Sequence, residues 1–257
     1  MSEAVLSAGD ALLQAERLTR RFGGLAAVDD VSLDFRRGEV HAVIGTNGAG
    51  KSTLVNMLSG ELVPSAGRIR LAGADITAWS QPRRARAGVG RSYQRTNIFD
   101  PLDVHENARL SAQAAHQRPW AIWERARGCR QSGAIAAEAL EASGLAALGG
   151  DLAGFLSHGG KRQLEIAMCL ATRPQVLLLD EPLAGMGAEE TERMLALLTE
   201  LKRDHAILLV EHDMDAVFRV ADRITVMVNG QVIATDRPER IRANPEVRVA
   251  YLGEDQA

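Results

Sequence analysis

Short runs of apolar residues mark the first part of the chain, and several of them alternate with polar residues as β-strands do. Glycine-containing positions separate these runs at Gly23-Gly24, Arg37-Gly38 and Gly67, which is typical of turns. The pattern therefore predicts a region of short strands, namely Leu12–Leu18, Val31–Phe35, Val40–Ile44 and Ile69–Leu71.

The pattern changes between Gln94 and Ser157. Ala, Arg, Glu and Gln dominate this segment, apolar residues recur at helical spacing, and β-branched residues are few. These features predict a helical insertion of roughly 60 residues.

Strand and helix patterns alternate after the insertion. Such alternation favours a parallel sheet with crossover helices. Two further short strands, Ile224–Val228 and Gln231–Ala234, flank Asn229-Gly230, which is a strong hairpin signal. The alternating elements are expected at Val176–Asp180 (strand), Glu189–Arg203 (helix), Ala206–Val210 (strand) and Met214–Val220 (helix).

Composition narrows the class of protein. The 257 residues include 46% hydrophobic and 25% charged residues, which is ordinary for a soluble globular protein. The net charge of −3 gives no reason to expect nucleic-acid binding. The two cysteines, Cys129 and Cys169, are far apart and not spaced for a metal, so a reduced cytoplasmic protein is the simplest interpretation.

No apolar stretch is long enough to cross a bilayer. The N-terminus lacks a basic segment followed by an apolar one, so no signal peptide is expected. Any role at a membrane is therefore expected to depend on a partner.

Residues Gly45–Ser52 read Gly-Thr-Asn-Gly-Ala-Gly-Lys-Ser, which fits the phosphate-binding pattern Gly-x4-Gly-Lys-Ser/Thr. A predicted strand precedes the motif, and a helical pattern closed by Gly60 follows it. The glycines let backbone N–H groups point at phosphate oxygens, and the helix N-terminus adds positive dipole. Lys51 is expected to reach the β- and γ-phosphates, and the Ser52 hydroxyl to ligate Mg²⁺.

A second candidate site follows the apolar strand Val176–Asp180, which ends in Asp180-Glu181. Ligands bind at the carboxyl ends of strands in open α/β sheets. Asp180 is expected to hold Mg²⁺ through water, and Glu181 to orient or deprotonate the attacking water.

With these motifs, the chain resembles the ATP-binding subunits of ATP-binding-cassette (ABC) transporters over nearly its whole length, from Phe22 to Leu252. The family signature Leu-Ser-Gly-Gly-Gln appears as Leu156-Ser157-His158-Gly159-Gly160. The resemblance implies an α/β fold: one nucleotide-binding domain over residues 1–257, with a P-loop NTPase (RecA-like) parallel core, an antiparallel β subdomain and an α-helical subdomain inserted at about 94–157.

The resemblance also implies that two such subunits pair head to tail. Each ATP then lies between one subunit's phosphate loop and the signature of the other, where Ser157, Gly159 and the helix N-terminus face the γ-phosphate. ATP binding closes the pair, and loss of the γ-phosphate opens it.

Site residues are carried over by position. The catalytic residues are Glu181, Lys51 and His212, which follows a predicted strand. Phe22 corresponds to the aromatic residue that stacks against adenine, and simple core packing is its alternative role. Mg²⁺ is assigned to Ser52, Asp180 and Gln94. ATP binding is assigned to Phe22, Gly45, Asn47, Gly48, Ala49, Gly50, Lys51, Ser52, Thr53, Gln94, Ser157 and Gly159.

The finer resemblance is to the branched-chain amino acid (LivG-like) class of importers. It rests on Arg21–Val28, on Ser157–Gly159 with Gln163–Ala167, and on the tail from Asn244 to Gly253. It implies transmembrane permease subunits, a second ABC ATPase subunit (a paralogue or a second copy) and, indirectly, a periplasmic solute-binding protein as partners. The implied location is peripheral, on the cytoplasmic face of a bacterial inner membrane.

Alternatives remain open from sequence. The solute could be urea or a short amide, and the chain could be a soluble ABC ATPase not coupled to transport or a regulator that hydrolyses little. Gly160 and Gly187 replace the family's usual glutamine and aspartate, and Thr46 replaces a proline. The arginines at positions 83, 84, 86, 91 and 95 are expected to form a solvated face, with contact to lipid headgroups or an acidic partner as the alternative.

Overall fold

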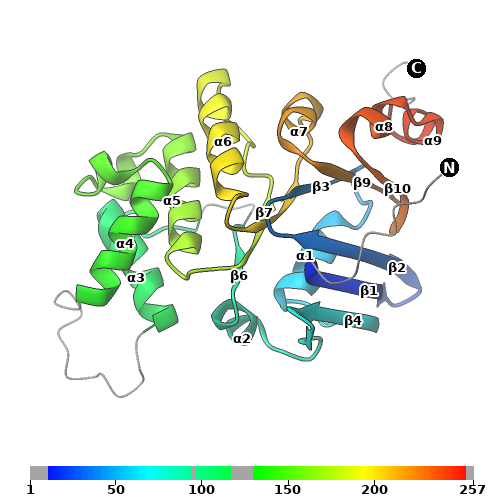
Figure 1. The fold of residues 1–257 in the computed structure, drawn as a ribbon, viewed down its shortest axis with the longest axis horizontal. Helices are drawn as coiled ribbons and strands as arrows, with labels where there is room; N and C mark the ends of the chain where they lie inside the picture. Colours follow the sequence, from blue (N-terminus) through cyan, green and yellow to red (C-terminus); the bar gives the residue numbers. More distant parts are fainter. Residues whose placement is uncertain (1–10, 94–96, 117–129, 253–257) are drawn as a thin grey trace.

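The computed structural model describes residues 11–93, 97–116 and 130–252 (Figure 1). A six-stranded sheet forms its centre, with strand order β10-β9-β3-β8-β7-β6. All neighbouring pairs are parallel except β9 with β10, which form the hairpin predicted at Asn229-Gly230. The strands are β3 (Val40–Gly45), β6 (Val89–Arg91), β7 (Val176–Asp180), β8 (Ala206–Val210), β9 (Arg223–Val228) and β10 (Gln231–Asp236).

Strands β7 and β8 are buried along their whole length, in agreement with sequences that are apolar throughout except for Asp180 at the end of β7. Successive side chains point to opposite faces. Leu178 and Leu208 pack toward α1 (Lys51–Ser59), whereas Leu177 and Leu209 pack toward α6 (Ala188–Leu201) and α7 (Met214–Val220). Helices on both faces of a parallel sheet are what the alternating pattern predicts, so this prediction is confirmed.

A second, antiparallel sheet has the order β2-β1-β4-β5. Its strands are longer than predicted because pairing continues through polar positions up to a tight turn at Gly23-Gly24, where Phe22 pairs with Leu25. Helix α1 lies between the two sheets and shares one apolar cluster with both. The strands are β1 (Ala11–Phe22), β2 (Leu25–Arg36), β4 (Ala66–Leu71) and β5 (Ala74–Asp75).

The predicted helical insertion is present and forms its own apolar cluster to one side of the central sheet (Figure 1). Its described helices are α3 (Val104–His116) and α4 (Arg130–Ala142), and α5 (His158–Leu170) packs against both. Short 3-10 turns at Ala146–Leu148 and Ala153–Phe155 connect α4 to α5. The remaining helices are α2 (Gln81–Arg86), α8 (Pro238–Ala243), α9 (Pro245–Val247) and a π turn at Arg248–Leu252. No helix within the described ranges has the length and apolar content needed to span a membrane.

The expectation of a solvated arginine face is wrong for two of its residues. Arg84 is 1% exposed, and its guanidinium donates to the carbonyls of Met57 and Leu58 at 2.6 and 2.8 Å. Arg91 donates to Asn56 Oδ1 at 2.5 Å and to Ser59 Oγ at 2.8 Å. Arg84 thus donates to carbonyls at the C-terminal end of α1, where a helix lacks intrahelical partners, and Arg91 binds polar side chains of the same helix end. Arg83 and Arg86 are exposed as expected, and Arg95 lies outside the described residues.

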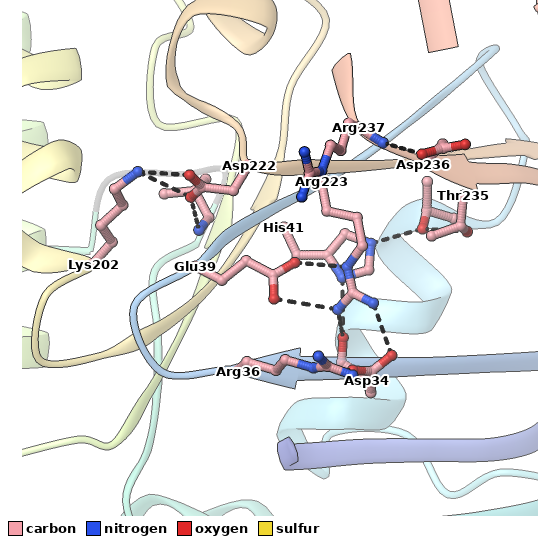
Figure 2. A network of polar contacts seen from close by, with 12 residues as sticks. Asp34, Arg36, Glu39, His41, Lys202, Asp222, Arg223, Thr235, Asp236 and Arg237 are labelled. Carbon is pink, nitrogen blue, oxygen red and sulfur yellow. Dashed lines mark hydrogen bonds and ion pairs between the residues drawn. The ribbon is translucent and has the colours of Figure 1, made fainter. Parts of the chain in front are cut away.

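A partly buried polar network joins the two sheets (Figure 2). Arg223 of β9 donates to the Asp34 carboxylate at 2.9 Å and to Glu39 at 2.6 Å. His41 of β3 is fully buried, with Nδ1 3.1 Å from the Asp34 carbonyl and Nε2 2.7 Å from Thr225 Oγ1. Because a carbonyl only accepts, His41 carries its proton on Nδ1 and accepts at Nε2. The strand that leads into the phosphate loop is thereby fixed to both sheets.

Candidate active site

The phosphate loop joins β3 to α1 and requires glycine at two close approaches. A Cβ at Gly50, whose φ is 98°, would lie 2.2 Å from the Ala27 carbonyl oxygen. A Cβ at Gly45 would lie 2.1 Å from the Met227 carbonyl oxygen. Helix α1 begins directly at Lys51, so its N-terminal N–H groups face the loop, while Ser52 is exposed there.

Lys51 points back into this loop. Its ammonium donates to the carbonyls of Gly45 at 2.6 Å and Thr46 at 3.0 Å, and the residue is 6% exposed. Burial lowers the pKa of Lys51, while the charges of Glu181 and Asp180 act in the opposite direction. The structure thus places the Lys51 ammonium group at the loop, near the carboxylates of Asp180 and Glu181.

Asp180 ends β7 and is 2% exposed. Its Oδ1 is buried and has no hydrogen-bond partner among the described residues. Burial raises the pKa of Asp180, and the nearby positive charges of Arg91, His212 and Lys51 only partly offset this. An unpaired buried carboxylate oxygen is costly unless a cation or an ordered water takes it.

This arrangement fits Mg²⁺. The described residues contain no group of three or more His, Cys, Asp or Glu side chains able to hold a metal. Mg²⁺ is commonly bound by one or two protein oxygens, with waters and substrate phosphates as its other ligands. The buried Asp180 oxygen and the exposed Ser52 hydroxyl are oxygen ligands of that kind.

Glu181 follows Asp180 in a left-handed conformation with φ of 53°, which is unfavourable for a residue with a side chain. Its N–H donates to the Val210 carbonyl at 2.8 Å, and its carboxylate contacts His212 Nε2. Strained residues of this type concentrate at functional sites. The ends of β7 and β8 therefore bring a carboxylate and an imidazole together.

Glu211 supports this pair. It is 3% exposed and accepts from the backbone N–H of Leu183 at 2.7 Å and of His212 at 3.1 Å. Burial raises the pKa of its carboxyl group, and these two hydrogen bonds counteract the rise. The Glu211 carboxylate thus links the segment that follows β7 to the segment that follows β8.

The signature segment makes hydrogen bonds to α6, to the Ala184 carbonyl in the segment before α6, and within itself. Ser157 is the N-cap of α5, and its Oγ accepts from the Gly160 N–H at 3.1 Å. The same hydroxyl donates to Glu190 Oε1 at 2.8 Å, and the Gly159 N–H donates to that oxygen at 3.2 Å. Despite Gly160, α5 begins at His158.

Of the other residues assigned to the site, Phe22 is described by the structure and Gln94 is not. Phe22 is 48% exposed at the end of β1, with the Arg20 guanidinium carbon 4.8 Å from the ring centroid, so the alternative of core packing is wrong. Gln94 lies outside the described residues. Glu190 was not predicted as part of the site, because its contact with Ser157 spans 33 positions and only the expected helix start at Glu189 hints at its place.

Comparisons with known proteins agree with this geometry. The family model described as ABC transporter matches residues 28–184, and that described as branched-chain amino acid ATP-binding cassette transporter matches residues 231–257. The ATP-binding protein BraF of Pseudomonas aeruginosa, named for high-affinity branched-chain amino acid transport, is 40% identical over 95% of this chain and 98% of its own. The LivG protein of Salmonella typhimurium, with the same description, is 41% identical over the same shares.

Solved structures give the same result. A nucleotide-free ATP-binding cassette from an ABC transporter superposes with a TM-score of 0.84 at 29% identity, covering 94% of this chain and 98% of that one. The structure of the ADP conformation of an ATP-binding cassette of an ABC transporter gives a TM-score of 0.81 at 29% identity over 95% of this chain and 99% of that one. The phosphate loop, the acidic end of β7 and the signature at α5 are shared features of one family, and this chain belongs to it, as an ATP-binding subunit of the ABC transporters.

Proposed function

We propose that the chain is the ATP-hydrolysing subunit of an importer for branched-chain or related hydrophobic amino acids. One observation supports the ATPase activity: four side chains converge at the ends of β3, β7 and β8. They are Lys51, Asp180, Glu181 and His212. The solute class is supported by the relatives named for branched-chain amino acid transport and by the match of residues 231–257.

ATP would be held by the loop N–H groups, the N-terminus of α1 and Lys51. The ammonium of Lys51 exchanges its two loop carbonyls for phosphate oxygens, which are stronger acceptors because they are charged. Ser52, Asp180 and Gln94 would hold Mg²⁺, which when bound neutralises phosphate charge. The exposed ring of Phe22 would stack on adenine.

Hydrolysis would depend on Glu181 and His212. The Glu181 carboxylate orients the attacking water and accepts its proton. His212 holds that carboxylate in place and contributes to stabilising charge on the transferred γ-phosphoryl group. Lys51 would stabilise charge on the same group.

The second half of each ATP site would come from a companion cassette, either a second copy of this chain or a paralogue. Ser157, Gly159 and the N-terminus of α5 offer a hydroxyl, an N–H group and a positive dipole for a γ-phosphate bound to the partner. ATP would thereby join the two subunits, and its hydrolysis would release them.

Coupling to permease subunits would use a groove between the core and the helical insertion. A cavity of about 220 Å³ lies there, lined by α2, β6, α3, α5, the end of α1 and the segments next to β6 and α5. It includes Gln81, Tyr93, Ser111 and Met168, a mixture of polar and apolar side chains suited to a short helix from a permease. The chain would then lie peripherally on the cytoplasmic face of the inner membrane, linked only indirectly to a periplasmic solute-binding protein and not to nucleic acid.

The catalytic proposal is tested by Glu181→Gln. The amide keeps the shape of the side chain but cannot accept the water's proton, so we expect ATP turnover to fall by at least about 100-fold with ATP binding retained. Lys51→Ala provides the complementary variant and is expected to lose ATP binding itself. Phosphate release at the same rate from wild type and Glu181→Gln would reject the role of Glu181.

The solute is tested in proteoliposomes that contain the complete transporter. Leucine, isoleucine or valine, supplied with the solute-binding protein, is expected to stimulate ATP hydrolysis and to accumulate inside the vesicles. Stimulation by urea or short amides in place of these amino acids would assign the importer to the alternative solute class. ATP hydrolysis that no permease alters would favour a cassette not coupled to transport.

A further inference from the structure

Glu190 in the first turn of α6 occupies the hydrogen-bond donors of the signature segment. Its Oε1 accepts from the Ser157 hydroxyl at 2.8 Å and from the Gly159 N–H at 3.2 Å. Its Oε2 lies 3.4 Å from the Gly187 backbone nitrogen, which donates to it. A Cβ at position 159 would lie 2.6 Å from Glu190 Cδ, so this approach requires the glycine.

These are the donors that the proposed function assigns to the partner's γ-phosphate. A hydroxyl has one proton and an N–H has one, so neither can serve the carboxylate and a phosphate oxygen at full strength. Two anions on the same donors would also repel each other. The space in front of Ser157, Gly159 and Glu190 is about 20 Å³, which is room for about one water molecule rather than a phosphate group.

We propose that Glu190 is an internal stand-in for the γ-phosphate, which keeps the signature segment occupied until an ATP-loaded partner displaces it. The inference rests on the proposed function of Ser157 and Gly159. It makes Glu190 a positioning residue that sets how much ATP is needed for the two cassettes to close. Gly187, where the family usually has an aspartate, supplies no competing carboxylate at this helix end.

The charge of Glu190 and its surroundings suit this role. The hydrogen bond from Ser157 holds the pKa of the Glu190 carboxyl below its usual range, so the side chain is an anion at neutral pH. Arg193 lies one turn further along α6, and its exposed guanidinium is 3.4 Å from Glu189 Oε1. A displaced Glu190 can therefore turn toward Arg193 and remain paired, which makes the displacement reversible.

The test uses the assembled transporter with Glu190→Gln, and Glu189→Gln as its matched control. Glu189 lies in the same turn and is exposed, but it has no hydrogen bond to the signature segment. Removing the charge of residue 190 is expected to lower the KM for ATP about threefold to tenfold and to leave kcat within about twofold. Glu189→Gln is expected to change neither constant.

The outcomes separate the inference from the proposed function. An unchanged or raised KM in Glu190→Gln would overturn the inference, because a carboxylate that only braces the helix would weaken ATP use when altered. Glu190→Ala must shift KM in the same direction as Glu190→Gln for the inference to hold. Absence of ATP hydrolysis by the wild-type complex would instead reject the proposed function.

Discussion

At the scale of single residues, Asp180 shows a conflict between stability and function. A buried carboxylate with an unpaired oxygen destabilises the folded chain, yet the same oxygen is what a magnesium ion or its bound water requires. Glu181 shows the same conflict in its backbone, which adopts a left-handed conformation at the adjoining position. The chain tolerates both costs at the one place where phosphate chemistry is expected.

Replacing Asp180 with Asn is therefore expected to stabilise the nucleotide-free protein while removing activity. Because burial raises the pKa of Asp180, its charge costs stability above the unfolded pKa, and this cost disappears as the pH falls below it. At pH 7 the gain is expected to be about 1 kcal/mol in urea unfolding, with ATP turnover lowered at least about 100-fold. The exposed Asp204→Asn is the control and should alter neither quantity; a less stable Asp180→Asn protein would contradict this account.

Residues in local motifs could be identified from sequence, and those defined by distant contacts could not. Lys51, Ser52 and Asp180-Glu181 each belong to a short pattern joined to a strand, and the structure places them after β3 and at the end of β7, which β8 separates in the sheet. Glu190 belongs to no such pattern. Only the packing of α5 against α6 brings it to Ser157.

At the scale of elements, helix and strand types were predictable because their apolar periodicity is local. The limits of β1 and β2 were not, since they depend on pairing between two strands rather than on either sequence alone. The arginine run was misjudged for a related reason. Composition favours a solvated face, but the end of α1 supplies carbonyl acceptors that draw Arg84 inward.

Arg84→Ala is accordingly expected to destabilise the protein by about 3 kcal/mol. It removes the guanidinium donor from the buried Leu58 carbonyl, takes one of two donors from the Met57 carbonyl, which keeps the Gly60 N–H, and opens a space where the side chain packed. Arg83→Ala is the matched control, because Arg83 is exposed and stacks on Trp79 with its guanidinium carbon 3.9 Å from the ring centroid. Urea unfolding would measure both, and equal losses in the two variants would refute the capping role.

At the scale of the whole molecule, the phosphate loop depends on how two sheets are held together. Helix α1 lies between them, and the network around His41 and Arg223 joins β2 of one sheet to β3, β9 and β10 of the other (Figure 2). Because β3 and α1 flank the loop, its geometry depends on this junction. The overall α/β arrangement was predictable from sequence, but the junction was not, since Asp34 and Arg223 are 189 positions apart.

The junction makes the stability of the folded chain depend on pH through His41, and a substitution of this residue can measure its contribution. Burial lowers the pKa of His41 from 6.5 to about 3, with the charge of Arg223 acting in the same direction. Below pH 6.5 the unfolded chain takes up a proton at His41 that the folded chain cannot, so stability falls as the pH drops from 6.5 toward 3. The carboxylates of Asp34 and Glu39 and the guanidinium of Arg36 also face this site.

His41→Gln should remove this dependence while keeping a donor and an acceptor in place. Between pH 7.5 and pH 5.5, His41 alone is expected to cost the wild type about 1.4 kcal/mol of unfolding free energy, since one pH unit below the unfolded pKa corresponds to about that amount. The variant is therefore expected to lose about 1.4 kcal/mol less unfolding free energy than the wild type over the same pH range. Every other titrating group affects both proteins alike. Urea unfolding at the two pH values measures the difference, and parallel losses would mean that His41 accepts a proton in the folded state and that the junction does not hold it neutral.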